Sequence, residues 1–169
     1  MKYLINGNYK NDTLLKLILS LGLIFILIFW GTNILLFAEK MGFSYKSVVN
    51  YYMGDEEFRN PLSYIGLLEV THFHLFSFAL FLIMLNHLML FTRISYPVKM
   101  ALIVISFVSA AMNMGAGWLI RFVSPAFAYL KIYSFWIFQV STLLIIIFSF
   151  VSLKNRGCSK TEDERINAD

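Results

Sequence analysis

Charged residues are scarce in this sequence, and their scarcity excludes an ordinary soluble domain. Aspartate, glutamate, lysine and arginine make up 14% of the 169 residues, whereas apolar residues make up 59%. A soluble domain of this length needs a larger polar surface, so the composition indicates a membrane protein. The formal net charge of +4 is spread over several short segments and does not suggest nucleic-acid binding.

Cysteine is also scarce. The only one, Cys158, lies in the polar C-terminal segment. A single cysteine forms no disulfide within the chain, no CxxCH haem attachment motif and no thiolate cluster for a metal ion. Any redox centre must therefore use other side chains.

Four long stretches contain no lysine, arginine, aspartate or glutamate. Each is 21 to 23 residues long, and they cover residues 17–38, 70–92, 100–120 and 132–153. About 20 residues of α-helix cross a hydrocarbon core of roughly 30 Å, and only a helix satisfies its own backbone there. Helices of a soluble bundle would carry a polar face, which these stretches lack.

The predicted fold is therefore all-α, a four-helix transmembrane bundle within residues 1–153. The first apolar stretch is longer than the core of a signal peptide, so we interpret it as an uncleaved span. A polar cytoplasmic tail is expected at residues 154–169 and an outer loop at residues 39–65. The four spans are expected at about 14–38, 66–92, 98–121 and 128–153.

The distribution of basic residues predicts that both termini are cytoplasmic. Nine lysines and arginines flank the spans on the side of the termini and five on the other side, where Lys131 is counted as an outer-loop charge. Basic residues collect on the cytoplasmic side. We expect a multi-pass integral protein of the bacterial inner (cytoplasmic) membrane.

The outer loop carries a pattern of its own. Between Tyr45 and Met53, tyrosines and valines recur before Gly54. Tyrosine is enriched at the membrane–water interface, so this pattern predicts a short helix lying there.

All three histidines, His72, His74 and His87, lie on the second predicted span. At 100° per residue, Glu69, His72, Asn86 and His87 share an arc of about 100°, whereas His74 lies on a different side. Ionisable residues inside a membrane usually face protein or water. The polar stripe is therefore the leading candidate for a functional site.

His72 and His87 are fifteen residues apart, or roughly 22 Å along a helix, so one lies in each half of the membrane. This spacing resembles that of membrane b-type cytochromes, which stack two haems across the bilayer; the resemblance covers the second span only. It implies haem b bound by these two histidines, and Arg121 could bind a haem propionate. No other span has a histidine, so the opposite ligands would come from a second copy, a partner subunit, or methionines such as Met112 and Met114.

Other interpretations of the same residues stay open. The histidines could line a quinone pocket, or a metal ion could bind to Glu69 with His72 and either His74 or His87. Glu69 and Arg121 could form only an ion pair. The polar side chains could equally serve as hydrogen-bonding contacts between helices or with partner proteins.

The third span has a stripe of small and polar residues, which favours close helix packing over a cofactor groove. The stripe is expected to face the second span. Its members are Ser106, Ala110, Asn113, Gly117 and Arg121.

The sequence thus predicts a membrane subunit of a respiratory or redox complex. It would bind haem b or a quinone on the second span and pass electrons between the quinone pool and an extracytoplasmic partner. Its partners would be lipid, other membrane or extracytoplasmic redox subunits and a possible second copy. The alternative is a cofactor-free accessory or assembly subunit that anchors partner proteins. A transporter or channel is disfavoured, because no span carries a charge at its centre and there is no inverted repeat.

Overall fold

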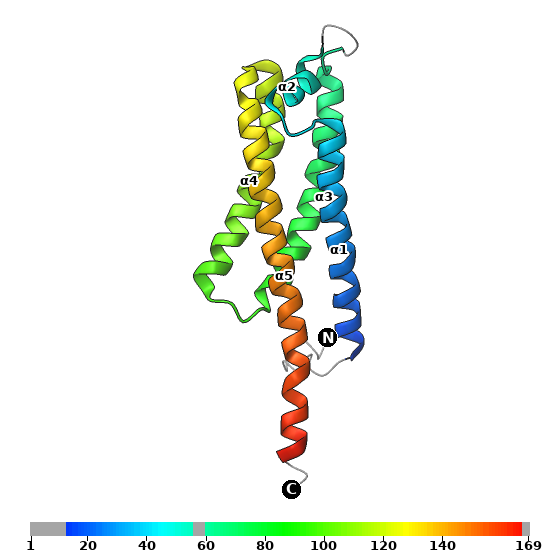
Figure 1. Ribbon diagram of the computed structural model, residues 1–169, viewed down its shortest axis with the longest axis vertical. Helices are drawn as coiled ribbons and strands as arrows, with labels where there is room; N and C mark the ends of the chain where they lie inside the picture. The colour runs from blue at the N-terminus through cyan, green and yellow to red at the C-terminus, as the bar shows by residue number, and fades with distance from the viewer. Residues whose placement is uncertain (1–12, 56–59, 167–169) are drawn as a thin grey trace.

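The computed structural model describes the backbone of residues 13–55 and 60–166, and the side chains of residues 14–55 and 60–153. In these ranges the chain forms long helices side by side, with a short helix across one end (Figure 1). Each long helix contains a segment long and apolar enough to cross a membrane. The all-α, four-span membrane bundle is therefore confirmed. The helices are α1 (Thr13–Lys40), α2 (Tyr45–Met53), α3 (Tyr64–Leu90), α4 (Tyr96–Phe122) and α5 (Ala128–Ile166).

The long helices extend beyond the charge-free stretches. Helix α3 starts at Tyr64, and α5 continues to Ile166 through the segment expected to be a polar tail. Residues 154–166 contain no proline that would interrupt a helix. The end of the bundle where α1 stops and α3 begins is called the outer end, after the predicted orientation.

Local sequence signals set the helix starts. The Ser63 hydroxyl accepts a hydrogen bond of 3.0 Å from the backbone N–H of Gly66 and caps α3. Pro97 lies in the first turn of α4, where its missing N–H costs nothing. Between α4 and α5 a short 3₁₀ turn, Pro125–Phe127, is capped by Ser124. The tight connections make α3, α4 and α5 antiparallel in sequence order.

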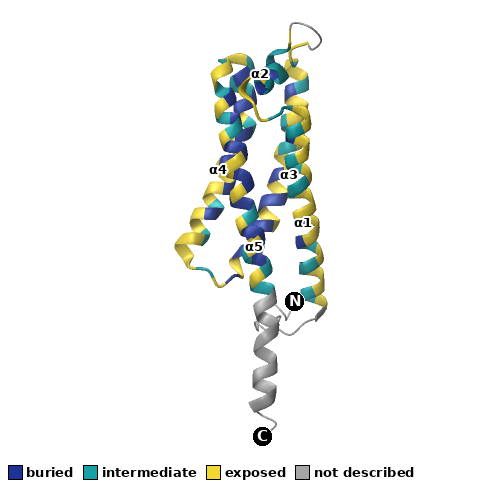
Figure 2. Cartoon of the chain, viewed as in Figure 1, coloured by how far each residue is buried: buried dark blue, intermediate teal, exposed yellow. Residues whose placement is uncertain are grey.

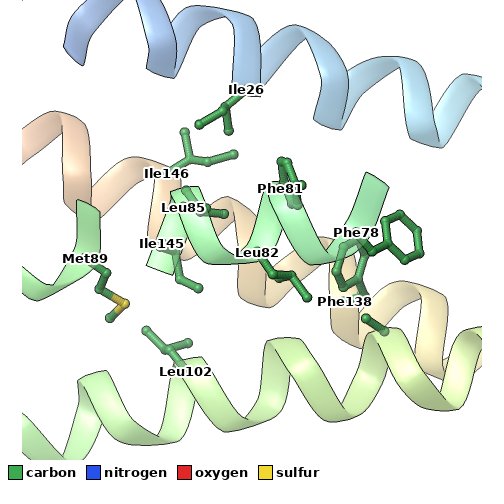
Figure 3. Packing of buried hydrophobic residues seen from close by; sticks show 11 residues of the cluster. Ile26, Phe78, Phe81, Leu82, Leu85, Met89, Leu102, Phe138, Ile145 and Ile146 are labelled. Carbon is green, nitrogen blue, oxygen red and sulfur yellow. The ribbon is translucent and has the colours of Figure 1, made fainter. Parts of the chain in front are cut away.

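Buried residues line the inside of the bundle, and exposed residues cover its outward faces (Figure 2). Towards the inner end, α1, α3, α4 and α5 meet in an apolar cluster that includes Ile26, Leu85, Leu102 and Ile145 (Figure 3). A second cluster at the outer end joins α2 to α1, α3, α4 and α5. The outward faces remain apolar, as expected for helices in contact with a lipid bilayer.

The small and polar stripe of α4 meets the second span, α3, as expected, and it also meets α5 and α2. Asn86 Nδ2 of α3 donates to Ser106 Oγ over 3.3 Å, as that expectation requires. Asn113, however, bonds to Lys131 of α5, and Gly117 lies against Tyr52 of α2. Rotation along a helix identifies a face, but the neighbour of that face is set by the order of the helices in the bundle.

Helix α2 confirms the short helix predicted in the outer loop. Gly42 and Gly54 flank it with φ of 66° and 87°, a conformation that favours glycine. Val48 and Tyr52 are buried against the bundle. The helix therefore closes the outer end of the bundle with one of its faces, which the interfacial interpretation did not anticipate.

Gly117 gives a direct test of how α2 docks. A Cβ at this position would lie 3.0 Å from the Tyr52 ring, whereas one at Gly115 would meet nothing within 4 Å. We expect Gly117→Leu to lower the free energy of unfolding by about 1–3 kcal/mol through overpacking. Gly115→Leu is the matched control, because it gains the same helix propensity without the clash. Thermal unfolding in detergent compares the two, and equal stability would contradict the docking described.

Candidate functional site

A cavity of about 110 Å³ lies inside the outer half of the bundle, beneath α2. All five helices contribute to its wall. Aromatic and aliphatic side chains form most of the lining, and a few polar groups interrupt it. The polar lining residues are Asn33, Lys40, Tyr51, Tyr52, Thr71, His74, Asn113 and Lys131.

Lys131 is the most buried basic residue of the cavity wall, with 7% of its surface exposed. It lies in the first turn of α5, and its Nζ donates to the backbone oxygen and to Oδ1 of Asn113 over 2.8 and 2.9 Å. Asn113 Nδ2 donates in return to the Lys131 backbone oxygen over 3.3 Å. These bonds fasten α4 to α5 at the level of the cavity.

Tyr52 covers the same region from α2 and is 3% exposed. Lys131 Nζ lies 5.9 Å from the centroid of its ring. The Tyr52 hydroxyl has a contact of 4.0 Å with Met41 Sδ, which is a weak acceptor. Burial, and secondarily the neighbouring Tyr51, raises the pKa of Tyr52 well above its ordinary value. The phenol therefore keeps its O–H donor at neutral pH.

His74 is the one histidine that lines the cavity. Its Nδ1 lies 2.8 Å from the backbone oxygen of Val70. A carbonyl oxygen can only accept, so Nδ1 carries the proton and Nε2 of the neutral ring is left as an acceptor. Thr71, one turn earlier, is already committed, because it donates to the Leu67 oxygen and accepts from Trp118 Nε1.

The structure divides the predicted stripe on α3: Asn86 is buried against Ser106 of α4, whereas the other three members face outward. Glu69, His72 and His87 are exposed on the outward surface of the helix, opposite the buried side that includes Leu67 and Leu85. His72 and His87 each have an aromatic neighbour, Phe73 within α3 and Phe91 just after its end, respectively. A group bound by these histidines would thus lie outside this bundle. The structure does not bring them together with His74.

Arg121 has a structural partner. Its Nε donates over 2.9 Å to the backbone oxygen of Leu62, which ties the segment before α3 to the end of α4. The guanidinium also lies 5.5 Å from the Phe122 ring centroid. No ion pair between Arg121 and Glu69 occurs in the described part of the chain.

No three histidine, cysteine, aspartate or glutamate side chains among residues 14–55 and 60–153 gather closely enough to hold a metal ion. A metal site on Glu69 with His72 and either His74 or His87 would need ligands from outside these residues. It remains a prediction.

Sequence reasoning missed Lys131 and Tyr52. Lys131 was counted as a loop charge because the fourth charge-free stretch starts one residue later. The proline at 125 was the available signal, since a helix restarting there places Lys131 in its first turns. Nothing local indicates that Tyr52 turns inward.

The link between Asn113 and Lys131 can be measured with a double-mutant cycle. Asn113→Leu removes the Oδ1 acceptor of the buried Lys131 amino group and leaves it only the backbone oxygen of residue 113, so we expect it to lower the free energy of unfolding by about 1–3 kcal/mol. Adding Lys131→Met removes the amino group that has lost this acceptor, and the double variant should lose less than the sum of the two single variants. Unfolding in detergent gives all four values. Simple additivity would show that the two side chains do not interact.

Comparison with known proteins places the chain by family alone. No curated protein and no solved structure matches it. The model of the Aq_1264_TM family, a transmembrane helical domain, matches residues 42–160. This region runs from before α2 into the last part of α5 and includes Tyr52, His74 and Lys131. Since the match covers well over half of the sequence, the chain belongs to the Aq_1264_TM family of transmembrane helical domains.

Proposed function

We propose that this integral membrane protein is a subunit of a redox complex that binds the ring of a quinone in the outer cavity. The observation that carries the proposal is a cavity with mainly apolar walls, into which a small set of polar groups converges. Sites for small molecules in proteins have this composition. The bilayer location suits quinones, which are membrane-soluble electron carriers.

The volume of the cavity favours a single ring over a larger cofactor. An engineered apolar cavity of roughly 150 Å³ binds benzene, and pockets for drug-sized ligands measure roughly 300–1,000 Å³. At about 110 Å³ the cavity approaches the first case. A haem macrocycle would not fit inside it.

The polar groups suit a ring that carries oxygen. A protonated Lys131 amino group has three N–H donors, and Asn113 accepts two bonds from it, so one donor remains for a ligand. The Tyr52 hydroxyl is a second donor. Phe37, Phe78 and Phe135 in the wall provide apolar contacts for the ring faces. A quinol supplies two electrons and two protons on oxidation, and the electrons would leave to an extracytoplasmic redox partner.

Direct binding tests the proposal. Purified protein in detergent is titrated with a short-chain quinone by calorimetry. We expect saturable binding, weakened roughly tenfold by Lys131→Met, because one hydrogen bond to a charged donor contributes about 1.5 kcal/mol or more. Lys46→Met, an exposed lysine of α2, is the matched control and should leave the affinity unchanged.

The melting temperature of each variant checks that it is folded. The proposal is wrong if the unmodified protein binds no quinone, or if folded Lys131→Met and Lys46→Met proteins bind it equally well.

Haem b is a second candidate, supported by the outward position of His72 and His87 on α3. Ionisable groups at membrane depth normally face protein, so their exposure favours a partner chain on this face. A haem would then lie between α3 and that chain, with the opposite ligand supplied by a second copy or another subunit. Bound there, haem b would supply one-electron transfer. Arg121 Nε already donates to the backbone oxygen of Leu62, so only the other N–H groups of its guanidinium are left to bind a propionate.

A reduced-minus-oxidised absorption spectrum of the protein purified with its natural partners tests the haem candidate. We expect b-type bands that diminish in His72→Ala and in His87→Ala, since each histidine would hold its own haem. His74→Ala is the control on the same helix and should leave the bands intact. Absence of both b-type bands and iron would overturn this candidate. Absence of quinone binding as well would leave the cofactor-free accessory subunit.

A further inference from the structure

The polar groups of the outer cavity differ in whether they can still donate or accept. We infer that the cavity binds the reduced, hydroxyl-bearing form of the ring in preference to the oxidised, carbonyl-bearing form. This inference rests on the proposed function and adds the form of the ring that the cavity selects.

His74 provides the acceptor. Its Nδ1 donates to the Val70 oxygen, so Nε2 of the neutral ring can only accept a hydrogen bond. Two other acceptors in the wall already have a donor: the Thr71 hydroxyl accepts from Trp118, and Asn113 Oδ1 accepts from Lys131. A ligand that forms hydrogen bonds with all of these polar groups therefore needs a donor of its own for His74 Nε2.

Lys131 and Tyr52 provide donors. Both forms of the ring have oxygens that accept hydrogen bonds from them, so these residues do not distinguish the two forms. The Asn33 amide can donate or accept a hydrogen bond, so it does not distinguish the two forms of the ring either.

His74 is therefore the residue that discriminates. A hydroquinone hydroxyl donates to Nε2 and accepts from other groups, whereas a quinone carbonyl can only accept. With a quinone bound, the imidazole acceptor would be shielded from water without a partner, which carries a free-energy cost. His74 is only partly buried, so we expect the free-energy cost of leaving its Nε2 without a partner to be at the low end of the range for buried groups. We expect roughly tenfold tighter binding of the reduced ring.

The experiment compares trimethylhydroquinone with trimethylbenzoquinone, which have the same ring substituents. Calorimetric titrations of the full-length protein are run anaerobically, with reductant present only for the hydroquinone. The hydroquinone should bind roughly tenfold more tightly. His74→Leu should bring the two affinities within about twofold of each other, because the quinone no longer shields an unpaired acceptor and the hydroquinone loses its hydrogen bond to Nε2. Lys46→Met, at an exposed position of α2, should preserve the difference.

The outcomes separate the two proposals. Equal binding of both forms by the unmodified protein, or an undiminished difference in folded His74→Leu, would overturn the preference and leave the quinone site standing. If neither form binds, the proposed function fails and the preference fails with it.

Discussion

A bilayer core offers no hydrogen-bond partners, and this constraint governs the whole molecule. The backbone meets it by forming helices. Many side chains meet it within their own helix, as Thr142 and Ser149 do by donating to backbone oxygens four residues earlier. The pair of Lys131 and Asn113 instead bonds across two helices. It fixes α5 against α4 at the outer end and holds the Lys131 amino group at the cavity wall.

The cavity depends on how α2 closes the bundle. Gly117 leaves room for the Tyr52 ring, and Gly42 and Gly54 allow the chain to turn into and out of α2. The Leu62 N–H donates to the backbone oxygen of Tyr52, and Arg121 Nε donates to the backbone oxygen of Leu62. Helix α2, the following segment and α4 are thus linked in series. Arg121, which the sequence suggested as a partner for a haem propionate, thus has a part in positioning the roof of the cavity.

The histidines of helix α3 lie on two different faces. His74 lies on the inward face with the cavity, where its tautomer is set by Val70. Glu69, His72 and His87 lie on the outward face. The proposed ring site lies on the inward face, and the proposed contact with a partner chain lies on the outward face. The two proposals therefore concern different histidines.

The sequence by itself determined the number of spans, because a charge-free stretch of more than 20 residues has only one stable state in lipid. It also located α2, and it separated His74 from His72 and His87, because 100° per residue is a local property of any helix. Only the tertiary structure decided that Asn113 meets Lys131, that Tyr52 turns inward and that His72 and His87 face outward. These facts depend on the lateral order of the helices, and that order is set by contacts between residues far apart in the chain. No local pattern specifies it.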